Sequence, residues 1–159
     1  MICRSLVGRP VEVGPAQQVL KQLTACVHER DAQVEGGSAV GNVLLQVGQV
    51  DGDIGNFCAN RPASVHQVTV TSLSFSLRQR QVLTGMKAGD TLYVASHGNG
   101  IWWGSAGSHT SVRSQDLLDF LALLLVPGVA VWLCICDSAP NALYLYQRRP
   151  DLRRVVGKQ

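Results

Sequence analysis

Residues 91–100, TLYVASHGNG, have the same form as residues 129–140, VAVWLCICDSAP. In both stretches a run rich in apolar residues stops abruptly at a turn of small and polar residues. Continuous apolar runs of this length are typical of parallel strands that are covered on both faces. The first run delivers His97 into its turn and the second delivers Cys136, so both residues are predicted to follow buried strands.

Helical patterns separate these strands from their neighbours in the chain. Residues 115–125 carry apolar side chains at helical spacing, with Ser114 as the expected N-cap. Residues 139–149 predict a short helix and residues 152–157 a last strand. Strands that alternate with helices imply crossovers and a mostly parallel sheet. We therefore expect an α/β fold, a three-layer sandwich whose mostly parallel central sheet has helices on both faces.

The first half of the chain has weaker patterns. Residues 14–28 show helical spacing, and residues 43–50 predict a first strand, followed by a loop over residues 51–63. Residues 65–77 alternate well enough for a strand, whose second half can continue into a helix. The tryptophan pair that follows His97 predicts a short hairpin. No repeat and no linker is visible, so residues 1–159 are expected to form one domain.

Composition and charge narrow the functional class. The 159 residues are 46% hydrophobic and 16% charged, which is typical of one globular domain. No apolar run reaches the roughly 18 residues of a membrane span, and the first residues lack the apolar core of a signal peptide. The net charge is +3, and basic residues gather late in the chain: Arg148, Arg149, Arg153, Arg154 and Lys158. Without aromatic platforms beside them, they predict a solvated helix end and edge strand. We expect neither a nucleic-acid nor a membrane partner.

The cysteines predict neither a disulfide framework nor a metal site. The chain contains Cys3, Cys26, Cys58, Cys134 and Cys136, an odd number at spacings unlike those of small disulfide scaffolds. Cys134 and Cys136 form a C-x-C pair without the further ligands that a zinc site needs. We expect reduced thiols, no metal, no cofactor and a cytoplasm-like compartment. Cys134 should lie two residues deeper than Cys136 and belong to the core.

His97 and Cys136 are predicted to meet at one edge of the sheet. Chemistry collects beyond the carboxyl ends of parallel strands, and a single crossover would bring these two strand ends together. A thiol is mostly protonated at neutral pH, whereas an imidazole can accept its proton and later protonate a leaving amine. Gly98 permits close approach of the backbone, and its N–H can help to hold an oxyanion.

These two blocks resemble those of the caspase-like (clan CD) cysteine peptidases, a family that includes caspases, metacaspases, legumain, gingipain, clostripain, separase and the self-processing domains of bacterial toxins. VASHGNG is similar to the His-Gly block and CICDSA to the nucleophile block, with a predicted helix where the family has its crossover. The resemblance covers about residues 89–157. It departs from the pattern at Ala139, where the family commonly has Gly, and at Ile135, where a small residue is common.

The resemblance implies a thiol protease, a hydrolase that uses a dyad of His97 and Cys136, with Gly98 at the oxyanion. It implies a peptide or protein substrate, a capacity for self-processing, and a place in the cytoplasm of the producing cell, or of a host cell if the protein is a delivered effector. The substrate side chain before the scissile bond would enter a pocket partly built by the loop after the first strand. Asp51 and Asp53 of that loop would complement a basic side chain, and Asp137 adjoins the nucleophile, although acidic residues are also common turn formers.

Three alternatives stay open at this point. The same fold without chemistry would be a pseudoenzyme that acts as a protein-interaction module, although such a module has no need of both His97 and Cys136. A serine hydrolase would use Ser96 or Ser138, but neither lies in a G-x-S-x-G elbow. In a purely structural interpretation, the pair is a turn histidine and a buried cysteine.

Overall fold

The computed structural model describes residues 10–13, 40–104 and 111–159, and the helix expected over residues 14–28 lies outside them. The described elements, in chain order, are β1 (Pro10–Val13), β2 (Val43–Val47), α2 (Gly52–Ala59), β3 (His66–Val70), α3 (Leu77–Thr84), β4 (Thr91–Ser96), β5 (Trp102–Trp103), β6 (Val112–Arg113), α4 (Ser114–Leu124), β7 (Ala130–Cys134), α5 (Ala139–Arg148) and β8 (Arg154–Lys158). Among these described helices, none has the length and apolarity needed to cross a membrane.

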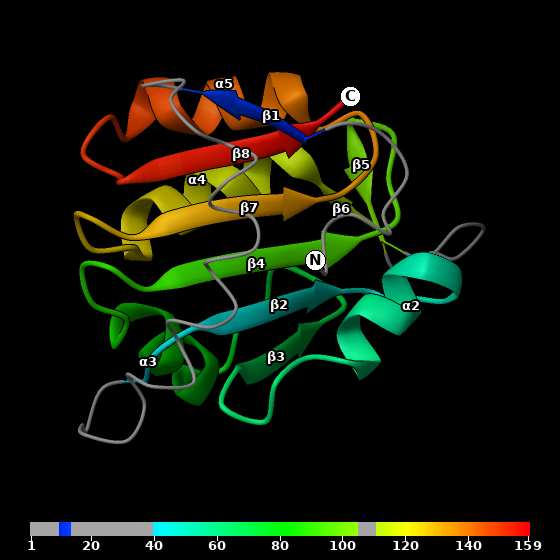
Figure 1. Ribbon diagram of the computed structural model, residues 1–159, viewed down its shortest axis with the longest axis horizontal. Helices are drawn as coiled ribbons and strands as arrows, with labels where there is room; N and C mark the ends of the chain where they lie inside the picture. The colour runs from blue at the N-terminus through cyan, green and yellow to red at the C-terminus, as the bar shows by residue number, and fades with distance from the viewer. Residues whose placement is uncertain (1–9, 14–39, 105–110) are drawn as a thin grey trace.

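Six of the described strands form one sheet in the order β1-β8-β7-β4-β2-β3 (Figure 1). The five strands from β8 to β3 are parallel, and β1 pairs antiparallel with β8. The short strands β5 and β6 form the hairpin expected at the two tryptophans. The chain is therefore an α/β protein with a mostly parallel central sheet, as the alternation of strands and helices predicted.

Helices cover both faces of this sheet and complete a three-layer sandwich. On one face the core contains Leu83 of α3, Leu121 of α4 and Leu145 of α5. On the opposite face Phe57 of α2 belongs to a second cluster that includes Trp132 of β7. Because successive residues of a strand point to opposite faces, a strand buried on both sides needs a continuous apolar run. β7 meets this condition, since all five of its residues are buried.

The strand order creates an opening at one edge of the sheet. β4 and β7 are hydrogen-bonded neighbours, with Ala95 opposite Cys134, so the expected adjacency of residues 91–96 and 129–135 is confirmed. From β2 the chain passes through α2 to β3 on one side, whereas from β4 it passes through α4 to β7 on the other. The loops that follow β2 and β4 therefore diverge, which leaves a crevice at their carboxyl ends, the usual ligand site in such sheets.

One prediction about secondary structure in the first half was wrong, and a second was right in part. Residues 51–63 were expected to be a loop, but they contain the helix α2, whose buried Ile54, Phe57 and Cys58 recur at helical spacing. The strand expected over residues 65–77 ends at Val70, and the helix into which it could continue is present as α3. The chain then turns and starts α3, where the capping box of Ser76 and Gln79 sets the boundary.

Two predictions in the second half were also wrong. Ser114 is the first residue of α4 and not its N-cap, because its hydroxyl donates a hydrogen bond to Gly100 O at 2.7 Å. Lys158 was expected to be solvated on an edge strand, but it is 2% exposed. Its strand β8 is covered by β1, which occupies the edge of the sheet instead.

Candidate active site

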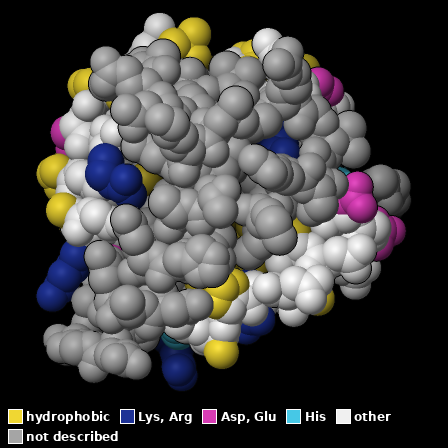
Figure 2. All heavy atoms as spheres, in the orientation of Figure 1, with side chains coloured by type: hydrophobic (Ala, Val, Ile, Leu, Met, Phe, Trp, Pro, Cys, Tyr) yellow, Lys and Arg dark blue, Asp and Glu magenta, His cyan; other side chains and the backbone are white. Residues whose placement is uncertain are grey.

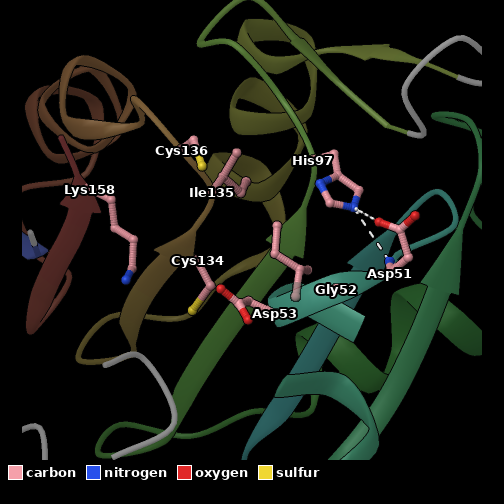
Figure 3. A pocket seen from close by; sticks show the side chains of 9 residues that line it. Asp51, Gly52, Asp53, His97, Cys134, Ile135, Cys136 and Lys158 are labelled. Carbon is pink, nitrogen blue, oxygen red and sulfur yellow. Dashed lines mark hydrogen bonds and ion pairs between the residues drawn. The ribbon is translucent and has the colours of Figure 1, made fainter. Parts of the chain in front are cut away.

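A cavity of about 150 Å³ opens at the carboxyl edge of the sheet (Figure 3). Its walls come from the start of α2 and from the ends of β4, β7 and β8. Among the residues that line it are Asp51, Asp53, His97, Cys134, Cys136 and Lys158. The crevice expected from the strand order therefore brings together the histidine, the cysteine and two of the three acidic residues singled out in the sequence.

Cys136 is the accessible thiol of the C-x-C pair. Cys134 is the last residue of β7 and is 1% exposed, whereas Cys136 lies beyond the strand and is half-buried. The chain turns at Asp137, which has a φ of 56°, in the left-handed region that Asp tolerates better than most residues. This turn presents the Cys136 thiol at the cavity wall, while Cys134 packs into the core as expected.

His97 is oriented by a carboxylate from a distant part of the chain. Its Nε2 lies 2.7 Å from Asp51 Oδ1, and the backbone N–H of Asp51 is also directed at this nitrogen, with 3.4 Å between Asp51 N and Nε2. The His97 carbonyl accepts hydrogen bonds from Gly104 N and from the Ser96 hydroxyl, both at 2.9 Å. Within the part of the chain that the structure describes, no hydrogen bond joins the imidazole to Cys136.

Gly98 is held against the tryptophan hairpin with no room for a side chain. It forms an isolated antiparallel bridge with Trp103, flanked by the hydrogen bonds Asn99 N to Trp102 O at 3.3 Å and Gly104 N to His97 O at 2.9 Å. A Cβ added at Gly98 would lie 2.4 Å from Trp103 Cδ1. The N–H of Asn99 and the carbonyl of His97, on either side of Gly98, both face the hairpin. The Gly98 N–H therefore points away from it. That N–H donates no hydrogen bond to the rest of the described structure.

The two serines considered as nucleophiles are occupied elsewhere. Ser96 is fully buried, and its hydroxyl lies 2.9 Å from both Val47 O and His97 O, which share its one hydrogen. Ser138 is also fully buried: its hydroxyl donates to Leu133 O at 3.2 Å and accepts from Lys158 N at 3.0 Å. Neither serine lines the cavity. Their role is to join strand ends, and a serine hydrolase has no support from this arrangement.

The three acidic candidates occupy different places. Asp51 and Asp53 line the cavity, and acidic side chains gather at the right-hand edge of the face in Figure 2, where Figure 1 places α2. Asp137 is exposed and does not line the cavity, so the structure does not place it with the other two. Asp51 contacts the imidazole of His97, whereas Asp53 lines the cavity without contacting it.

Two residues at or near the site were missed in the sequence, one that lines the cavity and one that lies behind it. Lys158 lines the cavity from the end of β8, and it shares the face of Val156 because alternate strand residues point the same way. Asn141, in the first turn of α5, donates to Gly100 O at 2.9 Å and to the Ser114 hydroxyl at 3.1 Å. For Asn141, the available signal was an amide side chain only five residues after Cys136. For Lys158, the signal was the alternation of the last strand continued by one residue.

Cys58 is a further thiol, on the inner side of α2. Burial raises the pKa of the Cys58 thiol to about 11, so this group is protonated at neutral pH. The described residues contain no group of three or more His, Cys, Asp and Glu side chains arranged to hold a metal ion.

The chain was also compared with known proteins. No family model, no curated protein and no solved structure matched it.

Proposed function

We propose that this protein is a cysteine endopeptidase in which Cys136 is the nucleophile and His97 the general base. One observation carries the proposal: an accessible thiol and an oriented imidazole line the same cavity at the carboxyl ends of two adjacent parallel strands. This is where α/β sheets place their chemistry. The resemblance of the two sequence blocks to caspase-like peptidases supports the same assignment.

The residues account for each step of peptide-bond hydrolysis. His97 accepts the thiol proton, and the Cys136 thiolate attacks the carbonyl carbon of the scissile bond to form a tetrahedral oxyanion. The imidazolium then protonates the leaving amine as the C–N bond breaks, which leaves a thioester. His97 next takes a proton from water, the resulting hydroxide attacks the thioester, and the carboxylic product leaves as the thiol is restored.

Two backbone N–H groups are suited to the oxyanion. The Gly98 N–H points away from the tryptophan hairpin, and neither it nor the Cys136 N–H donates a hydrogen bond within the described residues. Donors that are fixed before the reaction stabilise developing charge without reorganisation. A Cys136–His97 hydrogen bond is not required in the free enzyme, because such bonds often tighten only when substrate binds.

The proposed substrate is a peptide or protein, and the chain itself is one candidate. The cavity carries charges of both signs, from Asp53 on one wall and Lys158 on the other. Substrate preference is therefore best read from a peptide library varied at the residue before the scissile bond. A free thiol nucleophile fits a reducing compartment, such as the cytoplasm of the producing cell or of a host cell.

The test compares three variants with the wild-type protein under reducing conditions. Cys136→Ala and His97→Ala should abolish cleavage of the library, and of the chain itself, while leaving the fold intact by circular dichroism. Cys134→Ala is the matched control: it should lose of order 1 kcal/mol of stability through a small core truncation and keep its activity. Full activity in Cys136→Ala refutes the mechanism. An inactive wild-type protein would favour the interaction module instead.

A further inference from the structure

We infer that Asp51 is a positioning residue for His97 and not part of the substrate pocket, an inference that rests on the proposed function. The carboxylate of Asp51 lies 2.7 Å from His97 Nε2, although 46 residues separate the two in sequence. The site would then contain three residues: Cys136, His97, and Asp51, whose carboxylate holds the His97 ring in place.

The contact determines which ring nitrogen carries the proton. A carboxylate oxygen can only accept a hydrogen bond, so the 2.7 Å contact places a hydrogen on Nε2. The backbone N–H of Asp51 also points at Nε2 and would need it as an acceptor, but that approach is longer, at 3.4 Å, and the charged carboxylate contact outweighs it. In the neutral imidazole the second nitrogen, Nδ1, is then unprotonated and basic. Figure 3 shows Nδ1 on the side of the ring away from Asp51, toward the wall of the cavity that carries Cys136. Asp51 therefore holds the ring with its basic nitrogen facing the thiol.

The local structure of α2 is consistent with this use of the carboxylate. Asp51 occupies the N-cap position of α2, where an Asp side chain ordinarily accepts a hydrogen bond from the first turn. Here it makes no capping hydrogen bond and is directed to His97 instead. Gly52, the next residue, has a φ of 57°, a conformation that glycine adopts at little cost. The Asp-Gly pair thus lets α2 begin while the carboxylate turns back toward β4.

Exposure sets the expected size of the effect. The side chain of Asp51 is 92% exposed and that of His97 33% exposed, so water weakens their attraction. A buried triad carboxylate accounts for roughly 10⁴-fold in kcat, and we expect Asp51 to account for roughly 10- to 100-fold. The loss should fall on kcat, because the group orients the base and does not hold the substrate.

The experiment uses the full chain and three substitutions at Asp51. Asp51→Ala removes the acceptor and should lower kcat about 10- to 100-fold, with KM changed less than about twofold. Asp51→Asn keeps an oxygen that can accept from Nε2–H and should restore part of kcat. Asp51→Ser can cap α2, so it should fold at least as stably as the alanine variant yet remain slow. The control Asp116→Ala removes an exposed acidic residue from the first turn of α4 and should match the wild-type protein.

A second readout does not depend on catalysis. With ¹⁵N-labelled histidine, the His97 Nε2–H proton should give a downfield NMR signal at low temperature, in the wild-type protein and in Asp51→Asn. Asp51→Ala should lose it. If this signal is present but no peptide is cleaved, the proposed function fails and the positioning role stands. The inference is overturned if Asp51→Ala keeps the signal and kcat, or if it raises KM for substrates with a basic side chain while kcat is unchanged.

Discussion

Asn141 Nδ2 donates a hydrogen bond to the carbonyl oxygen of Gly100 at 2.9 Å, and this bond ties α5 to the loop that follows His97. Asn141 is 9% exposed and also donates to the hydroxyl of Ser114 at the start of α4. Cys136 lies just before α5. One buried amide therefore joins the segment that carries Cys136 to the segment that carries His97.

Asn141→Ala should loosen this coupling. The substitution removes both donated hydrogen bonds, and we expect a loss of about 1–2 kcal/mol in the free energy of unfolding, measured by urea denaturation. We expect turnover to fall as well, because this bond links the loop after His97 to the helix that follows Cys136. Gln147→Ala, at an exposed position of the same helix, should stay within about 0.5 kcal/mol of the wild-type protein. An unchanged kcat in Asn141→Ala would argue against the coupling.

Gly98→Ala should damage both folding and activity. The new methyl group would lie 2.4 Å from Trp103 Cδ1 and 2.8 Å from Trp102 O, so the hairpin or the backbone at Gly98 must shift. Overpacking of this kind costs about 1–3 kcal/mol, and the shift would displace the N–H assigned to the oxyanion.

Gly89→Ala is the matched control, at the opposite end of β4. A Cβ at Gly89 meets nothing within 4 Å, but the residue has a φ of 94°. The substitution should therefore cost of order 1 kcal/mol through backbone strain alone and spare turnover. Thermal melts and peptide cleavage measure the two effects separately. Equal activity in both variants would remove Gly98 from the site.

The thiols should differ in their rates of alkylation. Cys136 is half-buried at the cavity, whereas Cys134 and Cys58 are buried. Since burial raises the pKa of Cys58 to about 11, its labelling by iodoacetamide should stay slow from pH 7 to pH 9 and rise only as the pH approaches that value. Peptide mapping by mass spectrometry after timed labelling gives the rate at each site. Faster labelling of Cys58 or Cys134 than of Cys136 would show that the wrong thiol has been chosen.

Arg149 and Asp151 should make a small, pH-dependent contribution to stability. Arg149 donates to both carboxylate oxygens of Asp151 at 2.8 Å, and this hydrogen bonding lowers the pKa of Asp151. A carboxyl group with a lowered folded-state pKa stabilises the fold above its ordinary pKa near 4, and the contribution is lost as the pH falls through the folded value.

Asp151→Asn tests this contribution. Because the Asp151 side chain is 41% exposed and water screens the pair, the substitution should cost only about 0.5 kcal/mol at pH 7. The difference from the wild-type protein should shrink toward zero near pH 2, as measured by urea denaturation at both pH values. A difference that grows on acidification would contradict the assignment.

Much of the fold could be predicted from the local sequence pattern. β4 and β7 are buried on both faces, and that condition requires the continuous apolar runs that identified them. α4 could be predicted for a similar reason, since its buried Leu117, Leu118 and Leu121 recur at helical spacing. The prediction failed at residues 51–63. Five of residues 51–56 are glycine, asparagine or aspartate and suggested a loop, although the buried Ile54, Phe57 and Cys58 form the inner face of α2.

His97, Gly98 and Cys136 could be selected as candidates from the sequence alone. Each is recognised by its own chemistry and by its place at the end of a predicted strand, and both depend only on neighbouring residues in the chain. The partners of these residues depended on the tertiary structure. Asp51 meets the imidazole only because β2 and β4 are adjacent and their loops diverge. Lys158 is buried only because β1 covers β8, and Asn141 reaches Gly100 only because α5 packs beside the hairpin loop. A single sequence carries no direct record of such contacts, since they join residues far apart in the chain through strand order and side-chain direction.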